Sequence, residues 1–365
     1  MTKIRTGKLD ANAASMDGQY PFFTCSKEPL RISTYSYDCE CVLVAGNGDL
    51  NVKYYNGKFD AYQRTYIIEN NNVEKLYLPY LYYFLETYIE ELRKQAIGGV
   101  IKYIKICNLS DAVIELPSIE KQKKIVKILK SSKKCLDMRN TQMAFLDGLI
   151  KARFVELFGD PRSNPYGFGK KLLRDTCKVV TGNTPSRSVE AYYGDYVEWI
   201  KTDNIVSGLL NPTKATESLS EEGMKVGRTV EKGSILMACI AGSIASIGRV
   251  CVTDRRVAFN QQISAIVPEE YNILFLYVLL QLSKEYLVEE INMALKGILS
   301  KSKLEEKEFI VPPMELQEQF ADFVHQVDKS KLLSLIKLLE QLITYLYNIF
   351  IIYRQDKGEE VEDHE

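Results

Sequence analysis

The sequence has only two histidines and one tryptophan, and its eight cysteines include no Cys-x-x-Cys pair. His364 lies in an acidic C-terminal segment and His325 in an apolar helical pattern, so neither is placed as a general base would be. With so few nitrogen ligands and such scattered thiols, we expect no metal site. Scattered free thiols are typical of a reducing compartment, which favours the cytoplasm.

Two further absences concern cofactors and membranes. No glycine-rich loop ends in Lys-Ser or Lys-Thr, and no Gly-x-Gly-x-x-Gly follows a strand pattern, so we expect this chain to bind no cofactor. No apolar run reaches about 18 residues, and residues 1–20 lack a basic start followed by an apolar stretch. We therefore expect no membrane span and no secretion signal. The chain is expected to perform no catalysis by itself.

The chain is long enough and apolar enough to form two domains, since it has 365 residues, of which 46% are apolar, and a net charge of −1. Residues 1–116 carry 13 basic and 14 acidic side chains, and residues 159–311 carry 19 of each. The segment 117–158, in contrast, has 10 basic and 4 acidic side chains, whereas 351–365 has 2 and 6. The last segment is therefore expected to be a disordered acidic tail.

The chain repeats itself after about 195 residues, which we infer from five matches in the same order. The offset is 175 residues at the first match and 193 to 197 at the others, so the second copy has about twenty extra residues, expected within 203–230. The matched segments are 6–7 with 181–182, 41–45 with 234–238, 61–64 with 258–261, 81–85 with 276–280, and 117–122 with 312–317.

Each copy has a strand-rich part and then a long helix. Short apolar runs separated by Gly, Asn and Asp predict strands, and helical patterns follow at about 80–95 and 274–295. A long pattern without a helix breaker then begins at a proline in each copy. The fold class is therefore α+β, with two repeated α/β domains separated by two long helices. We divide the chain into 1–116, 117–158, 159–311, 312–350 and 351–365.

The two long helices carry apolar residues at heptad spacing, which predicts that they form a coiled coil. Their opposite net charges, +6 and −2, suit pairing with each other. The alternative is that each helix packs on its own domain. The predicted seam residues are Val126, Leu129, Leu136, Met143 and Ile150 in the first helix, and Leu332, Ile336, Leu339, Ile343 and Leu346 in the second.

Several motifs resemble those of specificity subunits of type I restriction–modification systems. They are 154–161 at the end of the first long helix, 181–186, 198–204, 260–262, and the Pro-x-x-Glu-x-Gln starts of both long helices. The resemblance covers about residues 5–350. One departure is that 170–180 precede Thr181-Gly182, whereas only five residues precede Thr6-Gly7. We therefore expect the first domain to be short at its N-terminus.

The resemblance implies a subunit without catalytic activity. In this family two target-recognition domains each read one half of a bipartite double-stranded DNA sequence, and the helices after them pair antiparallel. Two methyltransferase subunits supply the chemistry with S-adenosylmethionine, and restriction or motor subunits can join them. The resemblance thus implies cytoplasmic DNA methylation with no membrane partner. The alternatives are a self-contained methyltransferase or nuclease, and a purely structural coiled-coil scaffold.

Candidate DNA-binding residues are polar or aromatic side chains in expected loops. Arginine suits guanine, and asparagine or glutamine suits adenine, although each of these could instead be a turn residue that bonds its own backbone. Because both domains are nearly neutral, we expect local clusters such as Arg249, Arg255 and Arg256, and weak binding by the chain alone. The candidates are Lys53, Tyr54, Tyr55, Gln63, Arg64, Thr184, Ser186, Arg187, Lys201, Thr202, Arg249, Asn260, Gln261 and Gln262.

Overall fold

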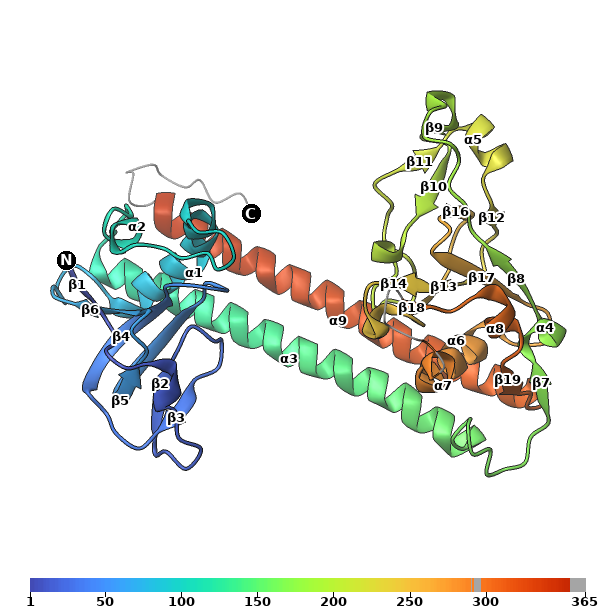
Figure 1. Ribbon diagram of the computed structural model, residues 1–365, viewed down its shortest axis with the longest axis horizontal. Coiled ribbons are helices and arrows are strands. Elements are labelled where there is room, and N and C mark those ends of the chain that lie inside the picture. Colours follow the sequence, from blue (N-terminus) through green and yellow to red (C-terminus); the bar gives the residue numbers. More distant parts are fainter. Residues whose placement is uncertain (290, 292–296, 355–365) are drawn as a thin grey trace. The chain divides into compact units, whose positions relative to one another are not determined.

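The computed structural model describes residues 1–289, 291 and 297–354 (Figure 1). Contacts between residues divide it into two compact units, which are described here one at a time. Unit 1 comprises residues 1–138 and those from 337 onward, and unit 2 comprises residues 139–336. Each unit therefore holds one strand-rich domain and part of each long helix. From residue 355 onward, the predicted acidic tail lies outside the described residues.

Unit 1 is built around a six-stranded sheet with the order β1-β6-β4-β5-β2-β3, in which only the β2–β5 pair is parallel. Alternate residues of β4 serve two cores: Val42 and Val44 pack with helix α1, and Cys41 and Leu43 pack with Phe59 on the other face. The elements are β1 (Thr2–Thr6), η1 (Ala11–Ala13), β2 (Tyr20–Phe23), β3 (Leu30–Ile32), β4 (Tyr37–Ala45), β5 (Val52–Ala61), β6 (Thr65–Asn70), α1 (Leu78–Gln95) and α2 (Ile106–Ser110).

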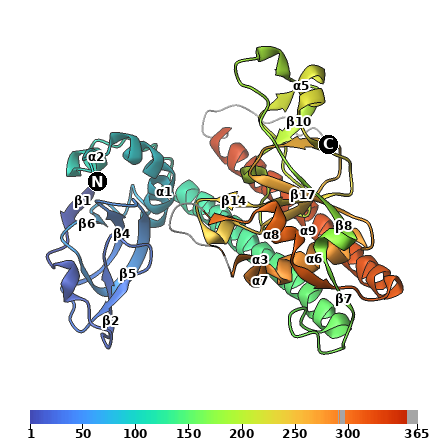
Figure 2. The ribbon, with the colours of Figure 1, turned by 45° about the vertical axis from the view of Figure 1, so that its right-hand side comes forward.

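Unit 2 contains a four-stranded sheet, β15-β13-β17-β8, and a five-stranded sheet, β12-β16-β10-β11-β9 (Figure 2). Its largest core joins the four-stranded sheet to helix α6 and to Phe154 and Phe320 of the long helices. The strands are β7 (Lys170–Leu172), β8 (Cys177–Thr181), β9 (Tyr193–Gly194), β10 (Val197–Ile200), β11 (Ser218–Leu219), β12 (Thr229–Val230), β13 (Ile235–Ala238), β14 (Ile240–Ala241), β15 (Val250–Val252), β16 (Val257–Phe259), β17 (Ile263–Pro268), β18 (Gly297–Ile298) and β19 (Glu308–Ile310).

The helix predicted over 274–295 is divided into two short helices. It separates at Ser283, whose φ of −90° and ψ of 11° leave the helical range. The helical elements of unit 2 besides the long helices are α4 (Leu173–Thr176), η2 (Glu190–Tyr192), η3 (Thr202–Asn204), α5 (Glu221–Val226), η4 (Ile244–Ser246), α6 (Ile273–Leu282), α7 (Lys284–Val288) and α8 (Lys301–Glu305).

The two units repeat one topology, as the sequence predicts. The strand order β1-β6-β4-β5 of unit 1 matches β8-β17-β13-β15 of unit 2, and the parallel pair β2–β5 matches β10–β16. Gly7 and Gly182 are equivalent, because a Cβ at either would lie 2.2 Å from the carbonyl oxygen of Ala61 or Asn260. The extra residues of the second copy, which include β11 and α5, lie between β10 and β13.

The glutamine of the Pro-x-x-Glu-x-Gln motif makes the same contacts in both units. Gln122 accepts a hydrogen bond from the Tyr77 backbone N–H (2.8 Å) and donates to the Pro117 carbonyl (2.8 Å). Gln317 accepts from the Asn272 N–H (3.0 Å) and donates to the Pro312 carbonyl (2.8 Å). Both side chains are buried. The motif therefore fastens the start of each long helix to the helix of its own domain.

We expect Gln317→Ala to destabilise the chain by about 2–3 kcal/mol, because it leaves a buried N–H and a buried carbonyl without partners. The measurement is the urea concentration at the midpoint of unfolding. Gln319→Ala is the matched control, since Gln319 is exposed and lies two residues further along the same helix. Equal midpoints for the two variants would show that the contacts of Gln317 contribute nothing.

The long helices α3 (Ile119–Phe158) and α9 (Met314–Arg354) pair antiparallel, as predicted. In unit 1 the Cys135 thiol donates to Gln341 Oε1 (2.9 Å). In unit 2 Lys331 Nζ lies 2.6 Å from Asp147 Oδ1. Residue numbers thus rise along α3 as they fall along α9. These contacts are polar, so the middle of the pair differs from a purely apolar coiled-coil seam.

The predicted seam is wrong for α9. Leu332, Ile336, Leu339, Ile343 and Leu346 are between 43% and 66% exposed, and we call these five residues the outer face of α9. Their spacing fits a heptad, but a second stripe one or two residues away, which includes Lys331, Ser334 and Gln341, is the one that contacts α3. The sequence could not distinguish the two stripes, because apolar residues occur on nearly every side of this part of α9.

The predicted seam residues of α3 are less exposed. Val126 and Ile150 are buried, Leu129 and Met143 are half-buried, and Leu136 is 38% exposed.

Helix α9 also bears on the expectation that the chain has no membrane span. By length and composition alone, the part Met314–Ile349 could cross a bilayer, since a stretch of 18 residues within it has a mean hydropathy of 1.2. The sequence criterion of an unbroken apolar run had excluded it because Lys337 and Glu340 interrupt the run. One such helix is weak evidence for a span, and the ionic contact of Lys331 with α3 gives this helix a partner within the protein.

Candidate nucleic-acid interface

The turn between β16 and β17 brings together four of the predicted residues at one end of the unit 2 sheets. Asn260 is buried and fixes the turn, since its Oδ1 accepts the Gln262 N–H (3.1 Å) and its Nδ2 donates to Gln262 Oε1 (3.2 Å). Gln261 is exposed and accepts a hydrogen bond from the Thr184 hydroxyl. Asn260 therefore holds the turn, while Gln261 and Thr184 face solvent together.

Arg249 and Thr202 lie at the same end of the sheets. The Arg249 guanidinium donates to the Thr202 carbonyl (3.3 Å) and to the Ser246 carbonyl (3.2 Å). Its own carbonyl accepts the N–H of Ala238, the last residue of β13, and the next residue, Cys239, donates to the Gln262 carbonyl. The exposed residues 242–245 precede this arginine. The turn 260–262, the loop 242–245, Thr202 and Arg249 thus form one continuous surface, which we call the rim.

Arg187 and Lys201 meet at a third side chain that sequence reasoning missed. Both cations bind Glu217, with Arg187 Nη2 lying 2.7 Å from Oε2 and Lys201 bound to Oε1. The Lys201 hydrogen bond is the main reason why the pKa of Glu217 is lowered. Glu217 lies in the extra residues of the second copy, so no repeat signal could point to it. Ser186, the neighbouring candidate, is exposed and shares a hydrogen bond with Ser188.

A second residue that sequence reasoning missed is the cation Arg228. It is exposed, its guanidinium donates to the Thr181 carbonyl (3.0 Å), and its backbone N–H donates to Asn183 Oδ1 (2.8 Å). It therefore lies beside the start of the segment that carries Thr184 and Arg187. Asn183 directly follows Thr181-Gly182, the pair that repeats Thr6-Gly7, and this repeated pair was the sequence signal that could have pointed to the neighbourhood of Arg228.

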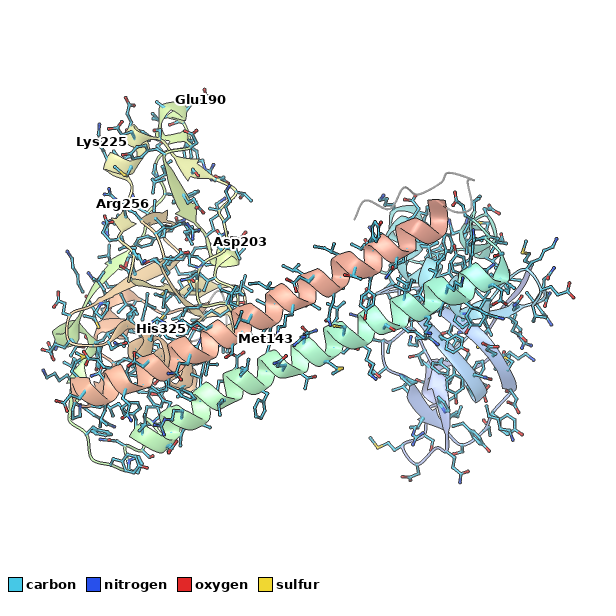
Figure 3. All side chains as sticks on the ribbon, turned by 180° about the vertical axis from the view of Figure 1, so that it is seen from behind. Met143, Glu190, Asp203, Lys225, Arg256 and His325 are labelled. Carbon is cyan, nitrogen blue, oxygen red and sulfur yellow. The ribbon has the colours of Figure 1, made fainter. Side chains whose placement is uncertain are left out.

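The expected cluster of Arg249, Arg255 and Arg256 does not form a free positive patch. Arg255 makes a two-pronged ion pair with Glu198 (2.8 and 2.9 Å), which keeps the pKa of that carboxyl below its usual range. Arg256 pairs with Glu231 (3.1 Å). Figure 3 shows Arg256 on the other side of the outer part of unit 2 from Asp203, the neighbour of Thr202. These two arginines stabilise the fold instead of extending the rim.

In unit 1 the equivalent turn carries Gln63 and Arg64, and both side chains are exposed. The Gln63 N–H donates to the Leu9 carbonyl, and the Arg64 carbonyl accepts the Gly46 N–H. The second bond matches the Cys239–Gln262 bond of unit 2. The same turn therefore lies at the same place in both copies, with glutamine at the first position of each (Gln63 and Gln261) and a different residue at the second (Arg64 and Gln262).

The other three candidates of unit 1 do not lie in a loop, contrary to the sequence interpretation. They belong to strand β5, which pairs with β4 along most of its length. The Tyr55 ring packs in the core, 5.0 Å from Phe23 and 5.6 Å from Phe59 between centroids. Lys53 binds Asn51 Oδ1, and burial lowers the pKa of its ammonium group. Tyr54 is 38% exposed and donates to Glu40.

The comparison with known families agrees with this duplicated architecture. The family model of the type I restriction modification DNA specificity domain matches residues 1–144 and 165–344. The chain belongs to this family. Both matched segments begin in a strand-rich domain and extend into a long helix, so the family model follows the repeat. Among the described residues, no group of three or more His, Cys, Asp or Glu side chains is arranged to hold a metal ion.

Two curated relatives are specificity subunits. The chain is 43% identical over 122 residues to the type I restriction enzyme EcoDI specificity subunit of Escherichia coli, which is 33% of this chain and 27% of that protein. It is 33% identical over 120 residues to the HindI specificity subunit of Haemophilus influenzae, which is 32% of this chain and 25% of that protein. The match thus spans about a quarter of each of these relatives.

Solved structures show that the fold is shared along the whole chain. The S subunit of a type I restriction-modification system from M. genitalium superposes with a TM-score of 0.60 at 16% identity, covering 96% of this chain and 93% of that one. A chain from a study of complex assembly in the type I R-M system gives 0.52 at 14% identity, covering 97% of both. The predicted α+β fold with two repeated domains and two long helices is confirmed.

Proposed function

We propose that this chain is the specificity subunit of a type I restriction–modification system, whose two domains each read one half of a bipartite double-stranded DNA sequence. The observation that carries the proposal is the repeated turn. It has the same backbone contacts in both units and an exposed glutamine, Gln63 or Gln261, at the same position, but the next residue is Arg64 in unit 1 and Gln262 in unit 2. A shared scaffold that carries a different side chain beside a common one is what two half-sites of different sequence require.

In this proposal the chemistry belongs to partner subunits in the cytoplasm. Two methyltransferase subunits bind S-adenosylmethionine and modify the DNA, and restriction subunits join the complex. The outer face of α9 supports a helical partner, because five large apolar side chains at heptad spacing are exposed on one side of that helix. We assign this face to the methyltransferase subunit. The alternative of a self-contained methyltransferase would require a glycine-rich cofactor loop and an Asn/Asp-Pro-Pro-Tyr/Phe motif, neither of which occurs in the sequence.

The proposal is tested by expressing the chain with and without a matching methyltransferase subunit in cells that lack DNA modification. We expect methylated DNA only when both are present, at a sequence made of two fixed parts separated by unspecified base pairs. The measurement is sequencing that detects modified bases. Methylation by the purified chain alone would overturn the proposal, as would methylation by the pair at a continuous, undivided sequence.

We expect Leu339→Glu to weaken binding to the methyltransferase subunit by about 30-fold, because a buried apolar contact of this kind contributes about 2 kcal/mol. The measurement is the dissociation constant of the two purified subunits. Thr344→Glu is the control, since Thr344 is exposed on α9 but lies off the outer face, and it should leave the constant unchanged. Equal constants for both variants would place the partner elsewhere.

A further inference from the structure

Glu217 joins two cations of unit 2 that border the rim. Its side chain is 34% exposed, and each of its oxygens binds a different partner, Arg187 on one side and Lys201 on the other. The Glu217 backbone carbonyl accepts the Trp199 N–H (3.0 Å), which fixes the residue against strand β10. This backbone hydrogen bond to β10 therefore helps to hold the Glu217 carboxylate between the two cations.

Aromatic rings position the same two cations. The Arg187 guanidinium lies 4.7 Å from the Tyr193 ring centroid and 5.1 Å from that of Trp199. Lys201 Nζ lies 5.1 Å from the Trp199 centroid. Such contacts hold a cation in place without neutralising its charge. The rings would therefore keep Arg187 and Lys201 in position if the carboxylate moved away.

This group is continuous with the rim. The Trp199 indole N–H donates to the Asn183 carbonyl (3.3 Å), and the Tyr193 hydroxyl donates to the Pro185 carbonyl (2.7 Å). These bonds hold the segment that carries Thr184, whose hydroxyl donates to Gln261. Gln261 belongs to the turn 260–262, which we call the reading turn. A DNA strand that places a base edge at Gln261 would have its backbone within reach of the neighbouring cations.

We propose that Glu217 occupies the place of a DNA backbone phosphate on Arg187 and Lys201, and that it must be exchanged for that phosphate when unit 2 binds DNA. This inference rests on the proposed function. A phosphodiester, like a carboxylate, has two equivalent oxygens that share one negative charge, so it fits the same two cations. Arg187 is 57% exposed and thus open to a ligand from solvent.

The exchange has a consequence for specificity. Nonspecific affinity for DNA depends on how many cations meet phosphates. With Glu217 in place, the two cations keep a net charge of only +1, so a sequence that offers no base contacts gains little from them. A correct half-site adds base contacts that compensate for displacing the carboxylate. Glu217 therefore lowers nonspecific binding and makes DNA recognition depend more on the reading turn.

Glu217→Gln tests the exchange, and Glu231→Gln is its matched control. Both variants change the net charge by +1, and Glu231 also pairs with an arginine of unit 2, but that arginine, Arg256, is not part of the rim. The measurement is the fluorescence anisotropy of a labelled duplex of arbitrary sequence, about 30 base pairs or three helical turns long. Each full-length variant is titrated between about 50 and 200 mM salt.

We expect Glu217→Gln to raise the affinity for this duplex about fivefold and to steepen the salt dependence by about 0.9 in logarithmic slope, the value of one added phosphate contact. Glu231→Gln should change neither beyond the effect of net charge. Arg187→Gln should remove the gain when combined with Glu217→Gln. Thermal unfolding midpoints of all variants show whether each is folded.

Three outcomes overturn the inference. Equal affinities for Glu217→Gln and Glu231→Gln would mean that only net charge matters. A gain that survives Arg187→Gln would mean that the phosphate binds elsewhere. If Glu217→Gln is unfolded, the single variant Arg187→Gln is the test instead. DNA affinity equal to that of the unaltered chain would then contradict the exchange. Failure of every protein, the unaltered chain included, to bind any duplex with the methyltransferase subunit present would instead refute the proposed function.

Discussion

Exchanging residues 162–311 for the corresponding domain of a family member is expected to change one half of the methylated sequence completely and to leave the other half as it was. The structure explains why this segment is separable. Strand β7 pairs with β19 near the two ends of the segment, with Lys170 opposite Ile310, and the Val311 N–H donates to the Gly169 carbonyl (2.8 Å). The chain therefore enters and leaves the domain at one place.

The exchange must preserve one set of contacts across the junction. Phe154, Phe158 and Phe320 of the long helices pack on Phe275 of α6 within the core of unit 2, at centroid distances of 5.4, 4.8 and 6.5 Å. A donor domain with an aromatic residue at the position of Phe275 keeps this cluster, whereas a small residue there opens a cavity that costs about 3–5 kcal/mol. Donors should be chosen accordingly.

The measurement is sequencing of modified bases in cells that hold the exchanged chain and the methyltransferase subunit. As a control, exchange of 1–116 alone should alter only the other half of the sequence. If either exchange altered both halves, the two domains would not read independently. If neither altered the sequence, another subunit would choose the DNA target.

The duplicated fold could be predicted from the sequence because repetition survives in residues whose roles are fixed by the backbone. Gly7 and Gly182 leave no room for a side chain, and Gln122 and Gln317 pair with buried backbone groups. Substitution at these positions costs stability in either copy, so the matches persist in both. The pairing of the long helices was predicted differently, from their apolar heptad spacing and opposite charges, and the resemblance implied the antiparallel direction.

The candidate site could be predicted only in part, because side-chain contacts between distant residues have no signature in local sequence. The polar run at Lys53 and Tyr54 was interpreted as a loop, although β5 continues its pairing with β4 through Gly57. Glu217 binds residues 30 and 16 positions earlier in the chain, so no spacing rule reveals it. The exposed turn residues, in contrast, were found from their residue types in an expected loop, although the sequence match paired Gln63 with Asn260, one residue before its structural equivalent Gln261.

The helix pair is expected to determine the number of unspecified base pairs between the two half-sites. Both α3 and α9 have residues in unit 1 and in unit 2, and polar contacts such as Cys135–Gln341 and Asp147–Lys331 fix their register on either side of Asn140. Four residues inserted into α3 after Asn140, together with four inserted into α9 after Ile336, would therefore lengthen both helices and keep these two contacts, although the hydrogen bond from Arg139 to Ser334 (3.2 Å) would be lost.

The inserted residues change both distance and rotation. Four residues add about 6 Å and about 40° of right-handed rotation beyond a full turn. Two base pairs of DNA add about 7 Å and about 70° in the same sense. The variant should therefore methylate a sequence with both half-sites unchanged and one or two more base pairs between them. Two residues inserted at both places add about 3 Å but about 200°, which turns one domain away from the DNA.

The two-residue variant should therefore lose methylation altogether. The four-residue insertion in α3 alone serves as a control, because it leaves either the Cys135 contact or the Asp147 contact out of register and should reduce assembly with the methyltransferase subunit. Sequencing of modified bases gives the spacer for each variant that remains active. If the doubly lengthened chain were active on the original spacer, the helices would not set the distance between the half-sites.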